Sequence, residues 1–181
     1  ALDDDVEKEY RDRQLYWACV VDDANHVSSA LEANAKSNAV GHAYKKQTPF
    51  HGAARHGSIA CLKLLLETKE AHLAIDKRDN DDNTPLLDCV RMSNFHEMFR
   101  TRNGEAVQLL LDAGADDTCV NCQNYRAIQY AKEPGIKALL SSTEAAIAQA
   151  NLRPPLSWDW VLVFAKGFVN VRHGLEPQYT K

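Results

Sequence analysis

The sequence contains no apolar run that approaches the roughly 18 residues needed to cross a bilayer, so we expect no membrane span. A signal-peptide pattern is also missing from its first residues. Glycine is sparse, with 8 in 181 residues. The patterns G-x-x-x-x-G-K, G-x-G-x-x-G and G-x-S-x-G do not occur, which excludes a phosphate-binding loop and a serine-hydrolase elbow of the usual kind.

Charge and cysteine content are both modest. The formal net charge of −4 gives no general attraction to nucleic acid or to acidic membranes, so we predict neither as a partner. The 5 cysteines are an odd number without the spacing of a disulfide framework. Reduced thiols predict a cytoplasmic protein. Because the chain begins with Ala1 rather than Met, the interior of an organelle, after removal of a targeting segment, stays open as an alternative.

One cysteine pair, Cys119-x-x-Cys122, has a metal-like spacing. A structural zinc site usually takes four ligands from two such pairs, and the sequence has no second pair. Cys19, Cys61 and Cys89 fall at helical positions that we expect to be buried. Together with the missing catalytic motifs, this predicts no metal, no cofactor and no catalytic residue.

A stretch in the middle of the chain has the features of a helix–turn–helix unit. It reads TPFHGAARHGSIACLKLLLE and runs from Thr48 to Glu67. The threonine hydroxyl can cap a helix N-terminus, and Pro49 suits the first helical position. Gly57 breaks the pattern, after which apolar residues recur at helical spacing. We predict one helix from about Pro49 to His56 and a second from Ile59 to Glu67.

The same features return further along the chain. Thr84-Pro85 begins the stretch TPLLDCV, and a leucine run at residues 109–111 is followed by Gly114, a suitable helix C-cap. Residues 93–104 are inserted between the two halves of this copy. Because an insertion into a repeat usually lies on one face and is often used for binding, we predict an exposed excursion here.

The two Thr-Pro pairs lie 84 − 48 = 36 residues apart, and each is followed by a pair of small residues, Ala53-Ala54 and Cys89-Val90. Thr-Pro, a small pair, Gly and a leucine run, in this order and at this period, resemble the ankyrin repeat. Two weaker copies, LYWACVVDDANHVSSALE and RAIQYAKEPGIKALL, flank the strong ones. The resemblance implies an all-α ankyrin-repeat solenoid of about four stacked helix–turn–helix units over residues 10–142. An acidic segment, residues 1–9, precedes it, and an extension, residues 143–181, follows it. Leu65 and Leu110 should be buried between units.

The resemblance also implies which residues contact a partner. Ankyrin stacks present a concave face of turn tips and inner helices, and its outward positions lie just before Thr-Pro and just after the small pair. In this sequence they are Tyr44, Lys45, Gln47, Arg55 and His56 in one copy, and Asn80, Asp81, Asn83, Arg91 and Met92 in the next. Lys45, Arg55 and Arg91 predict a basic strip that suits an acidic partner segment. His51 lies at a structural position, where its ring should bond to backbone near the turns.

The extension departs from the repeat. Alanines in TEAAIAQAN favour a helix, which Pro154-Pro155 ends. The next stretch, SWDWVLVFAKGFVNV, is the most apolar of the chain, and its periodicity fits either a helix or a hairpin. An apolar stretch of this size needs cover. We predict docking on a partner through Trp158, Trp160 and Phe164, with a cap over the last repeat as the alternative.

These observations predict a non-catalytic protein-interaction or scaffold module that binds protein partners through the concave face and the extension. Two alternatives stay open. One is an accessory subunit built permanently into a large multi-subunit assembly, organellar or otherwise. The other is the regulatory ankyrin part of a larger enzyme whose catalytic residues lie elsewhere.

Overall fold

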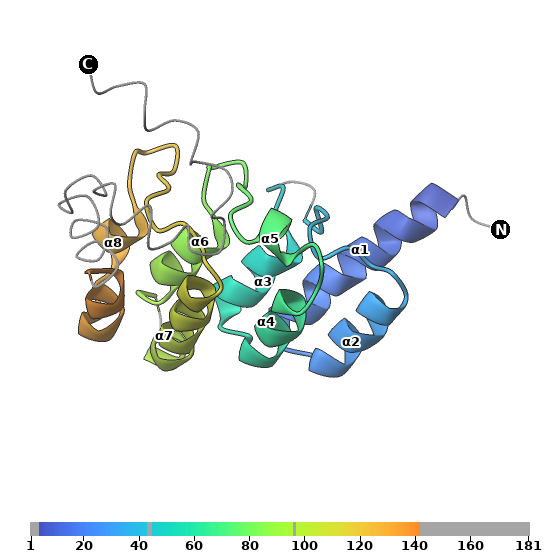
Figure 1. The fold of residues 1–181 in the computed structure, drawn as a ribbon, viewed down its shortest axis with the longest axis horizontal. Coiled ribbons are helices and arrows are strands. Elements are labelled where there is room, and N and C mark those ends of the chain that lie inside the picture. The colour runs from blue at the N-terminus through green and yellow to red at the C-terminus, as the bar shows by residue number, and fades with distance from the viewer. Residues whose placement is uncertain (1–3, 43–44, 96, 142–181) are drawn as a thin grey trace, which may run out of the picture. The chain divides into compact units, whose positions relative to one another are not determined.

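Helices in successive antiparallel pairs build the part of the chain that the structure describes. The computed structural model describes residues 4–42, 45–95 and 97–141, which all lie in one compact unit, Ala1–Thr143. The pairs stack side by side along this unit (Figure 1). The predicted all-α stack is therefore confirmed. The residues of the extension, including Trp158, Trp160 and Phe164, lie outside the described residues, as does Tyr44.

Four helix–turn–helix units follow one another. Their helices are α1 Asp4–Val20 with α2 Ala24–Glu32, α3 Pro49–His56 with α4 Ile59–Leu66, α6 Pro85–Met92 with α7 Glu97–Asp112, and α8 Ala127–Tyr130 with a helix over residues 134–141. A short helix, α5 Ala71–Ala74, lies in the connection between the second and third units. The predicted helices of the second unit are confirmed to within one residue.

Local sequence explains where these helices begin and end. Thr84 precedes α6, and its hydroxyl oxygen accepts a hydrogen bond from the Leu87 N–H at 3.3 Å. Gly57 ends α3 in the left-handed region, with φ of 64°, which favours glycine. A Cβ atom at this position would lie 2.7 Å from the Cβ atom of Arg102 in α7. Glycine is therefore required here by conformation and by the close approach of the next unit.

The apolar core runs through all four units. Leu62 and Leu65 of α4 and Leu110 of α7 have no exposed surface, and the predicted burial of Leu65 and Leu110 is confirmed. Cys19, Cys61 and Cys89 are also buried, as expected from their helical positions. Burial raises the pKa of the Cys89 thiol well above its ordinary range, so this side chain acts as a small apolar group.

The insertion at residues 93–104 extends the second helix of its unit. No glycine separates α6 from α7, and α7 begins at Glu97, well before the leucine run at residues 109–111. Ser93 and Asn103 are buried, and the Asn103 amide donates to the Cys89 carbonyl at 2.9 Å. The prediction of an exposed excursion is wrong at both ends of the insertion, because these polar side chains bond to α6. Phe95, between them, is exposed.

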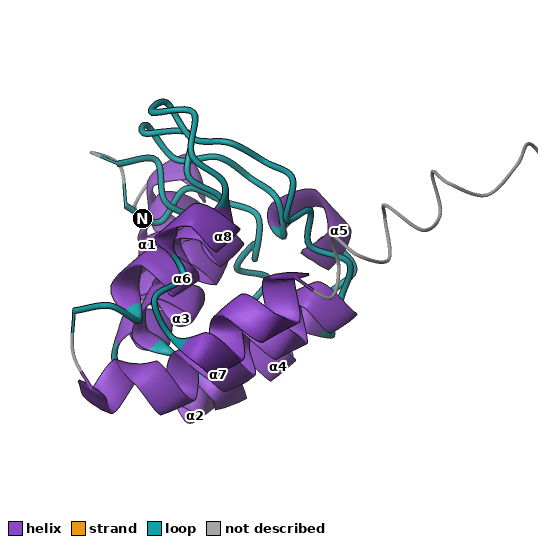
Figure 2. Ribbon diagram, turned by 90° about the vertical axis from the view of Figure 1, so that its left-hand side faces the viewer, coloured by secondary structure: helices purple, strands orange, loops and turns teal. Residues whose placement is uncertain are grey.

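The helices form two rows. The inner helices α1, α3, α6 and α8 lie in one row, the outer helices α2, α4 and α7 lie in the other, and the connecting loops project together to one side (Figure 2). We call these loops the finger loops; they comprise residues 33–42 with 45–48, 75–84, and 113–126. We call the side of the stack that the inner helices and the finger loops line its concave face (Figure 2).

Candidate functional site

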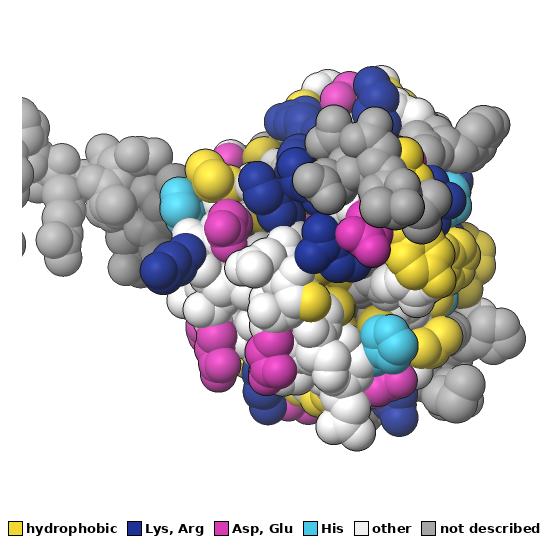
Figure 3. Space-filling model, turned by 90° about the vertical axis from the view of Figure 1, so that its right-hand side faces the viewer, with side chains coloured by type: hydrophobic (Ala, Val, Ile, Leu, Met, Phe, Trp, Pro, Cys, Tyr) yellow, Lys and Arg dark blue, Asp and Glu magenta, His cyan; other side chains and the backbone are white. Residues whose placement is uncertain are grey.

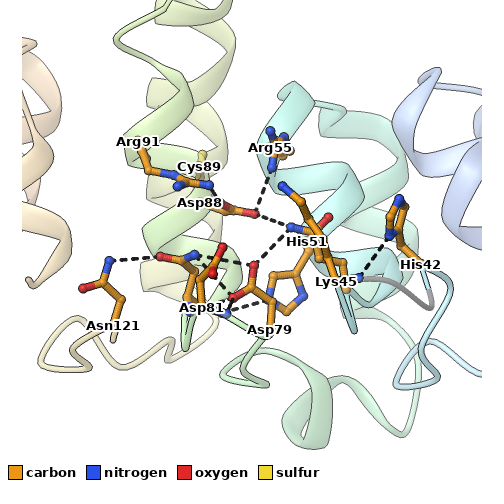
Figure 4. Close-up of polar contacts among 12 residues, drawn as sticks. His42, Lys45, His51, Arg55, Asp79, Asp81, Asp88, Cys89, Arg91 and Asn121 are labelled. Atoms are coloured by element: carbon orange, nitrogen blue, oxygen red, sulfur yellow. Dashed lines mark hydrogen bonds and ion pairs between the residues drawn. The ribbon is translucent and has the colours of Figure 1, made fainter. Parts of the chain in front are cut away.

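The centre of the concave face is a buried carboxylate between two arginines. Asp88 of α6 has no exposed side-chain surface. Its Oδ1 atom lies 2.8 Å from Arg91 Nη2, and its Oδ2 atom lies 3.6 Å from Arg55 Nη1 of α3 (Figure 4). The arginine side chains keep 23% and 30% of their surface, Arg55 and Arg91 respectively. Solvent therefore meets the positive half of this cluster, while its negative half is buried.

The two guanidinium groups retain capacity for further bonds. A guanidinium carries five N–H donors in a rigid fork, and the contacts to Asp88 use only part of this set. Planar forks of this kind match the geometry of a second carboxylate. The arrangement can therefore take an acidic side chain from outside while it holds its internal counter-ion.

A hydrogen-bond network beneath the arginines fixes Asp88. The Gln47 amide donates to Asp88 Oδ2 at 3.0 Å and to Asp79 Oδ2 at 3.2 Å. Gln47 Oε1 accepts from the Tyr16 hydroxyl of α1 at 3.1 Å. Asp79 Oδ1 in turn accepts from the backbone N–H groups of Asp81 and Asn83, each at 2.9 Å. One continuous network thus joins the first three units.

His51 belongs to the same layer and has a structural role. The Thr48 N–H donates to His51 Nδ1 at 3.2 Å, and His51 Nε2 lies 3.0 Å from the Asn83 carbonyl oxygen. Because Nδ1 accepts, the proton of the neutral ring is on Nε2 and is donated to that carbonyl. Burial lowers the pKa of His51 and favours this neutral form. The predicted bonding of His51 to backbone near the turns is confirmed.

Backbone hydrogen bonds join the finger loops to one another. The Asn80 N–H donates to the Lys45 carbonyl, and the Cys122 N–H donates to the Asp81 carbonyl, both at 3.0 Å. The Arg78 guanidinium also donates to the Val120 carbonyl at 2.8 Å. The loops therefore form one supported platform beside the inner helices. Asn80 and Asp81 are exposed on this platform, and Lys45 is half-buried.

The remaining predicted contact residues divide into a partly exposed group and a buried group. Arg55 and His56 at the end of α3, and Arg91 and Met92 at the end of α6, are brought together as partly exposed neighbours along the inner row. Burial lowers the pKa of His56, and the charge of Arg55 lowers it further, while Asp88 acts in the opposite direction.

Gln47 and Asn83 are the corrections. Both were expected to point outward, and both are buried, with 2% and 0% of their surface exposed. Their amide groups satisfy polar atoms inside the stack: Gln47 bonds to Asp79 and Asp88, and the Asn83 amide lies within hydrogen-bond distance of Asp79. A polar residue just before Thr-Pro is thus used here to join neighbouring units.

Two features of the face were missed by sequence reasoning. Asp88 stands in an apolar helical run, between Leu87 and Cys89, and this misplaced charge is the signal that could have found it. The second feature is an aromatic cluster of Tyr16, Trp17 and His42, which joins α1 to the first finger loop. Sequence offered little warning of it, because the first unit lacks Thr-Pro and the turn glycine.

The cysteine pair is separate from this face. Cys119 donates through its thiol to Asp116 Oδ2 at 3.4 Å, and burial and this hydrogen bond raise its pKa. Across the described residues, no group of three or more His, Cys, Asp or Glu side chains is placed to hold a metal ion. Nor does any helix in this part of the chain have the length and apolar character to cross a membrane.

About half of the chain matches a known protein family. Residues 15–101 match the family model of ankyrin repeats, which describes three copies. No curated protein matches the chain significantly. The matched segment contains the end of α1 from Leu15, the helices α2 to α6 and the beginning of α7, and with them Asp88 and both arginines of the cluster.

Proposed function

The chain is an ankyrin-repeat protein, and we propose that it is a non-catalytic interaction module whose partner binds the concave face over Arg55 and Arg91. Ankyrin repeats generally mediate protein–protein interaction and are typically non-catalytic. The observation that carries the choice of surface is the ion-pair cluster, in which two partly exposed guanidinium groups share one buried carboxylate. The partner chemistry that complements it is an acidic segment.

Preorganisation supports this choice. Interaction surfaces gain affinity when their side chains and loops are already ordered before binding. Asp88 pairs with the arginines, and Gln47 donates a hydrogen bond to Asp88. The finger loops are joined by the backbone hydrogen bonds of Asn80 and Cys122. A partner that contacts this face therefore meets groups whose ordering has already occurred on folding.

Site-specific photo-crosslinking tests the proposal. A photoreactive amino acid replaces Met92, which is half-buried beside Arg91 at the end of α6, in the full chain. The matched control carries the same group at Glu105, an exposed position on α7 in the outer row. The expected result is a protein adduct from position 92 that is weaker with Arg91→Gln and missing from position 105. Equal adducts from both positions, or adducts from position 105 alone, would remove the concave face from the account.

A further inference from the structure

An aromatic cluster of α1 and the first finger loop lies next to the cationic cluster, which consists of Arg55, Arg91 and their counter-ion Asp88. The rings of Tyr16 and Trp17 of α1 meet edge to face at 5.3 Å between centroids. His42, on the first finger loop, lies 5.6 Å from Tyr16 and 6.1 Å from Trp17. The Lys45 N–H donates to His42 Nδ1 at 3.3 Å, which ties the imidazole to the loop. Tyr16 is buried, whereas Trp17 keeps 48% of its surface exposed.

The exposed indole is not isolated. Trp17 continues a stripe along α1 that includes Val6, Tyr10 and, just beyond the helix, Val21, which is 69% exposed. These positions recur at helical spacing on the side of α1 opposite its buried residues. In the space-filling view of the N-terminal end of the stack, hydrophobic side chains gather at one side, beside basic ones (Figure 3). An apolar patch of this kind marks an interaction site.

The repeat register shows what does not fit on this patch. Trp17, Gly52 and Asp88 each precede the small pair of their unit, so they hold equivalent positions. In the second unit this position faces the preceding unit, because a Cβ atom on Gly52 would lie 3.2 Å from the Tyr16 ring. A helix packed on α1 as α1 packs on α3 would therefore meet the Trp17 indole. We therefore expect a segment other than a repeat helix to cover this patch.

The aromatic and cationic clusters are connected by the same buried hydrogen-bond network. Tyr16 contacts Trp17 through its ring and donates through its hydroxyl to Gln47, which donates to Asp88, the counter-ion of Arg55 and Arg91. Burial raises the pKa of Tyr16, and the charge of Arg55 acts against this shift. A chain of buried contacts therefore connects the exposed indole to the partly exposed guanidinium groups.

We infer that a peptide segment of a partner lies over the concave face and the adjoining N-terminal side of α1, and that this segment carries two kinds of side chain. A large apolar or aromatic side chain packs on Trp17, and an acidic side chain at a set spacing pairs with Arg55 and Arg91. This inference rests on the proposed function and adds the chemistry of the partner. Aromatic and arginine side chains in partly desolvated positions dominate interface energies, which suits both anchors.

Peptide selection tests the inference. A random peptide library displayed on phage is selected against the full chain. The best binder is then synthesised as three peptides: the parent peptide, a peptide whose apolar anchor is changed to Ser, and a peptide whose acidic residue is changed to the corresponding amide. Each peptide is titrated against wild type, Trp17→Ser, Arg91→Gln and a control, Leu73→Ser. Leu73 is exposed on α5, away from the inner helices (Figure 2). Circular dichroism checks folding, and Val21→Ser replaces Trp17→Ser if the latter does not fold.

The expected pattern is two separate couplings. Trp17→Ser lowers the affinity for the parent peptide about tenfold but does not change the affinity for the peptide without the apolar anchor. Arg91→Gln likewise lowers the affinity for the parent peptide but does not change the affinity for the peptide without the acidic residue. The Leu73→Ser variant binds like wild type. Coupling of the acid to Arg91 without coupling of the anchor to Trp17 would overturn this inference and leave the proposed function standing. Selected peptides that couple to neither residue, or a selection that yields no binder, would overturn both.

Discussion

Arg91 and Asp88 lie one turn apart on α6, and the guanidinium Nη2 atom is 2.8 Å from the carboxylate Oδ1 atom, which has no contact with solvent. The other oxygen of the same carboxylate faces Arg55 of the neighbouring unit. One buried charge therefore serves two arginines from two units. Because the same arginines are partly exposed on the concave face, the proposed recognition and the stability of the fold would depend on the same side chains.

Non-additive stability is the first consequence. Arg55→Gln or Arg91→Gln leaves Asp88 with one cationic partner, whereas the double substitution leaves a buried carboxylate with none. The double variant should lose about 3–5 kcal/mol of unfolding free energy, more than the sum of the single losses. Urea denaturation of the full chain measures all three. The control is Arg13→Gln, an exposed residue paired with exposed Glu9, which should change stability by less than about 1 kcal/mol. Additive losses would show that Asp88 does not couple the arginines.

The stability of the second unit should depend on pH through His51. Its pKa is lowered in the folded chain, so the unfolded chain takes up a proton first as the pH falls below about 6.5. Stability is fully present above that pH and declines as the pH falls towards the lowered pKa of the folded state. Urea denaturation at several pH values between 7.5 and 5 should follow this decline.

The third unit supplies a matched variant for that test. It has Leu87 where the second unit has His51, so His51→Leu copies a side chain that the fold already accepts. At pH 7.5 the variant should be less stable by about 1–3 kcal/mol, because the Thr48 N–H and the Asn83 carbonyl lose their partner. Its stability should change less with pH than that of wild type. An unchanged pH dependence would assign the effect to other groups, such as His56.

The leucines of the outer helices should carry a large share of the core energy. Leu65→Ala or Leu110→Ala, each at a fully buried position, should cost about 2–5 kcal/mol. Leu73→Ala, on the exposed side of α5, should change stability by only about 0.5 kcal/mol. Losses below about 1 kcal/mol at both buried sites would mean that these leucines do not form the shared core.

The insertion at residues 93–104, which lengthens α7, should be structural at its buried end. Asn103→Ala removes the side-chain hydrogen bond to the Cys89 carbonyl and should cost about 1–3 kcal/mol. Glu105→Ala, two residues further along α7, breaks only an exposed pair with Lys63 and should cost less than about 1 kcal/mol. Thermal denaturation of the two variants compares them directly. If the order of the two losses were reversed, the insertion would not be held by its contact with α6.

The sequence was sufficient to predict those features that depend on a residue and its immediate neighbours along the chain. Thr84, Pro49 and Gly57 identified helix ends because capping and left-handed backbone depend on neighbouring atoms, and the leucine run identified the core. The burial of Gln47 and Asn83 was missed, because a polar side chain before Thr-Pro can face solvent or a buried carboxylate. That choice is made by Asp79 and Asp88, which come from other parts of the sequence.

The insertion and the aromatic cluster show the same limit in another form. Without a glycine after Met92, nothing in the sequence fixes where α6 stops and α7 begins, and the answer depends on Asn103 reaching back to Cys89. Trp17 reads as one more apolar residue of a helix. Its exposure follows from its place on the side of α1 that faces away from α3, which requires the stack to be known.

The most direct test of the central claim is the salt dependence of association between the full chain and the partner identified by crosslinking. Arg91→Gln removes a positive charge from the concave face, while Lys63→Gln removes one from the outer row, so the two variants have equal net charge. If an acidic segment binds over the arginines, Arg91→Gln slows association at low salt and flattens its salt dependence, and Lys63→Gln associates like wild type. Equal rates for both variants, or a slower rate with Lys63→Gln, would contradict binding on the concave face.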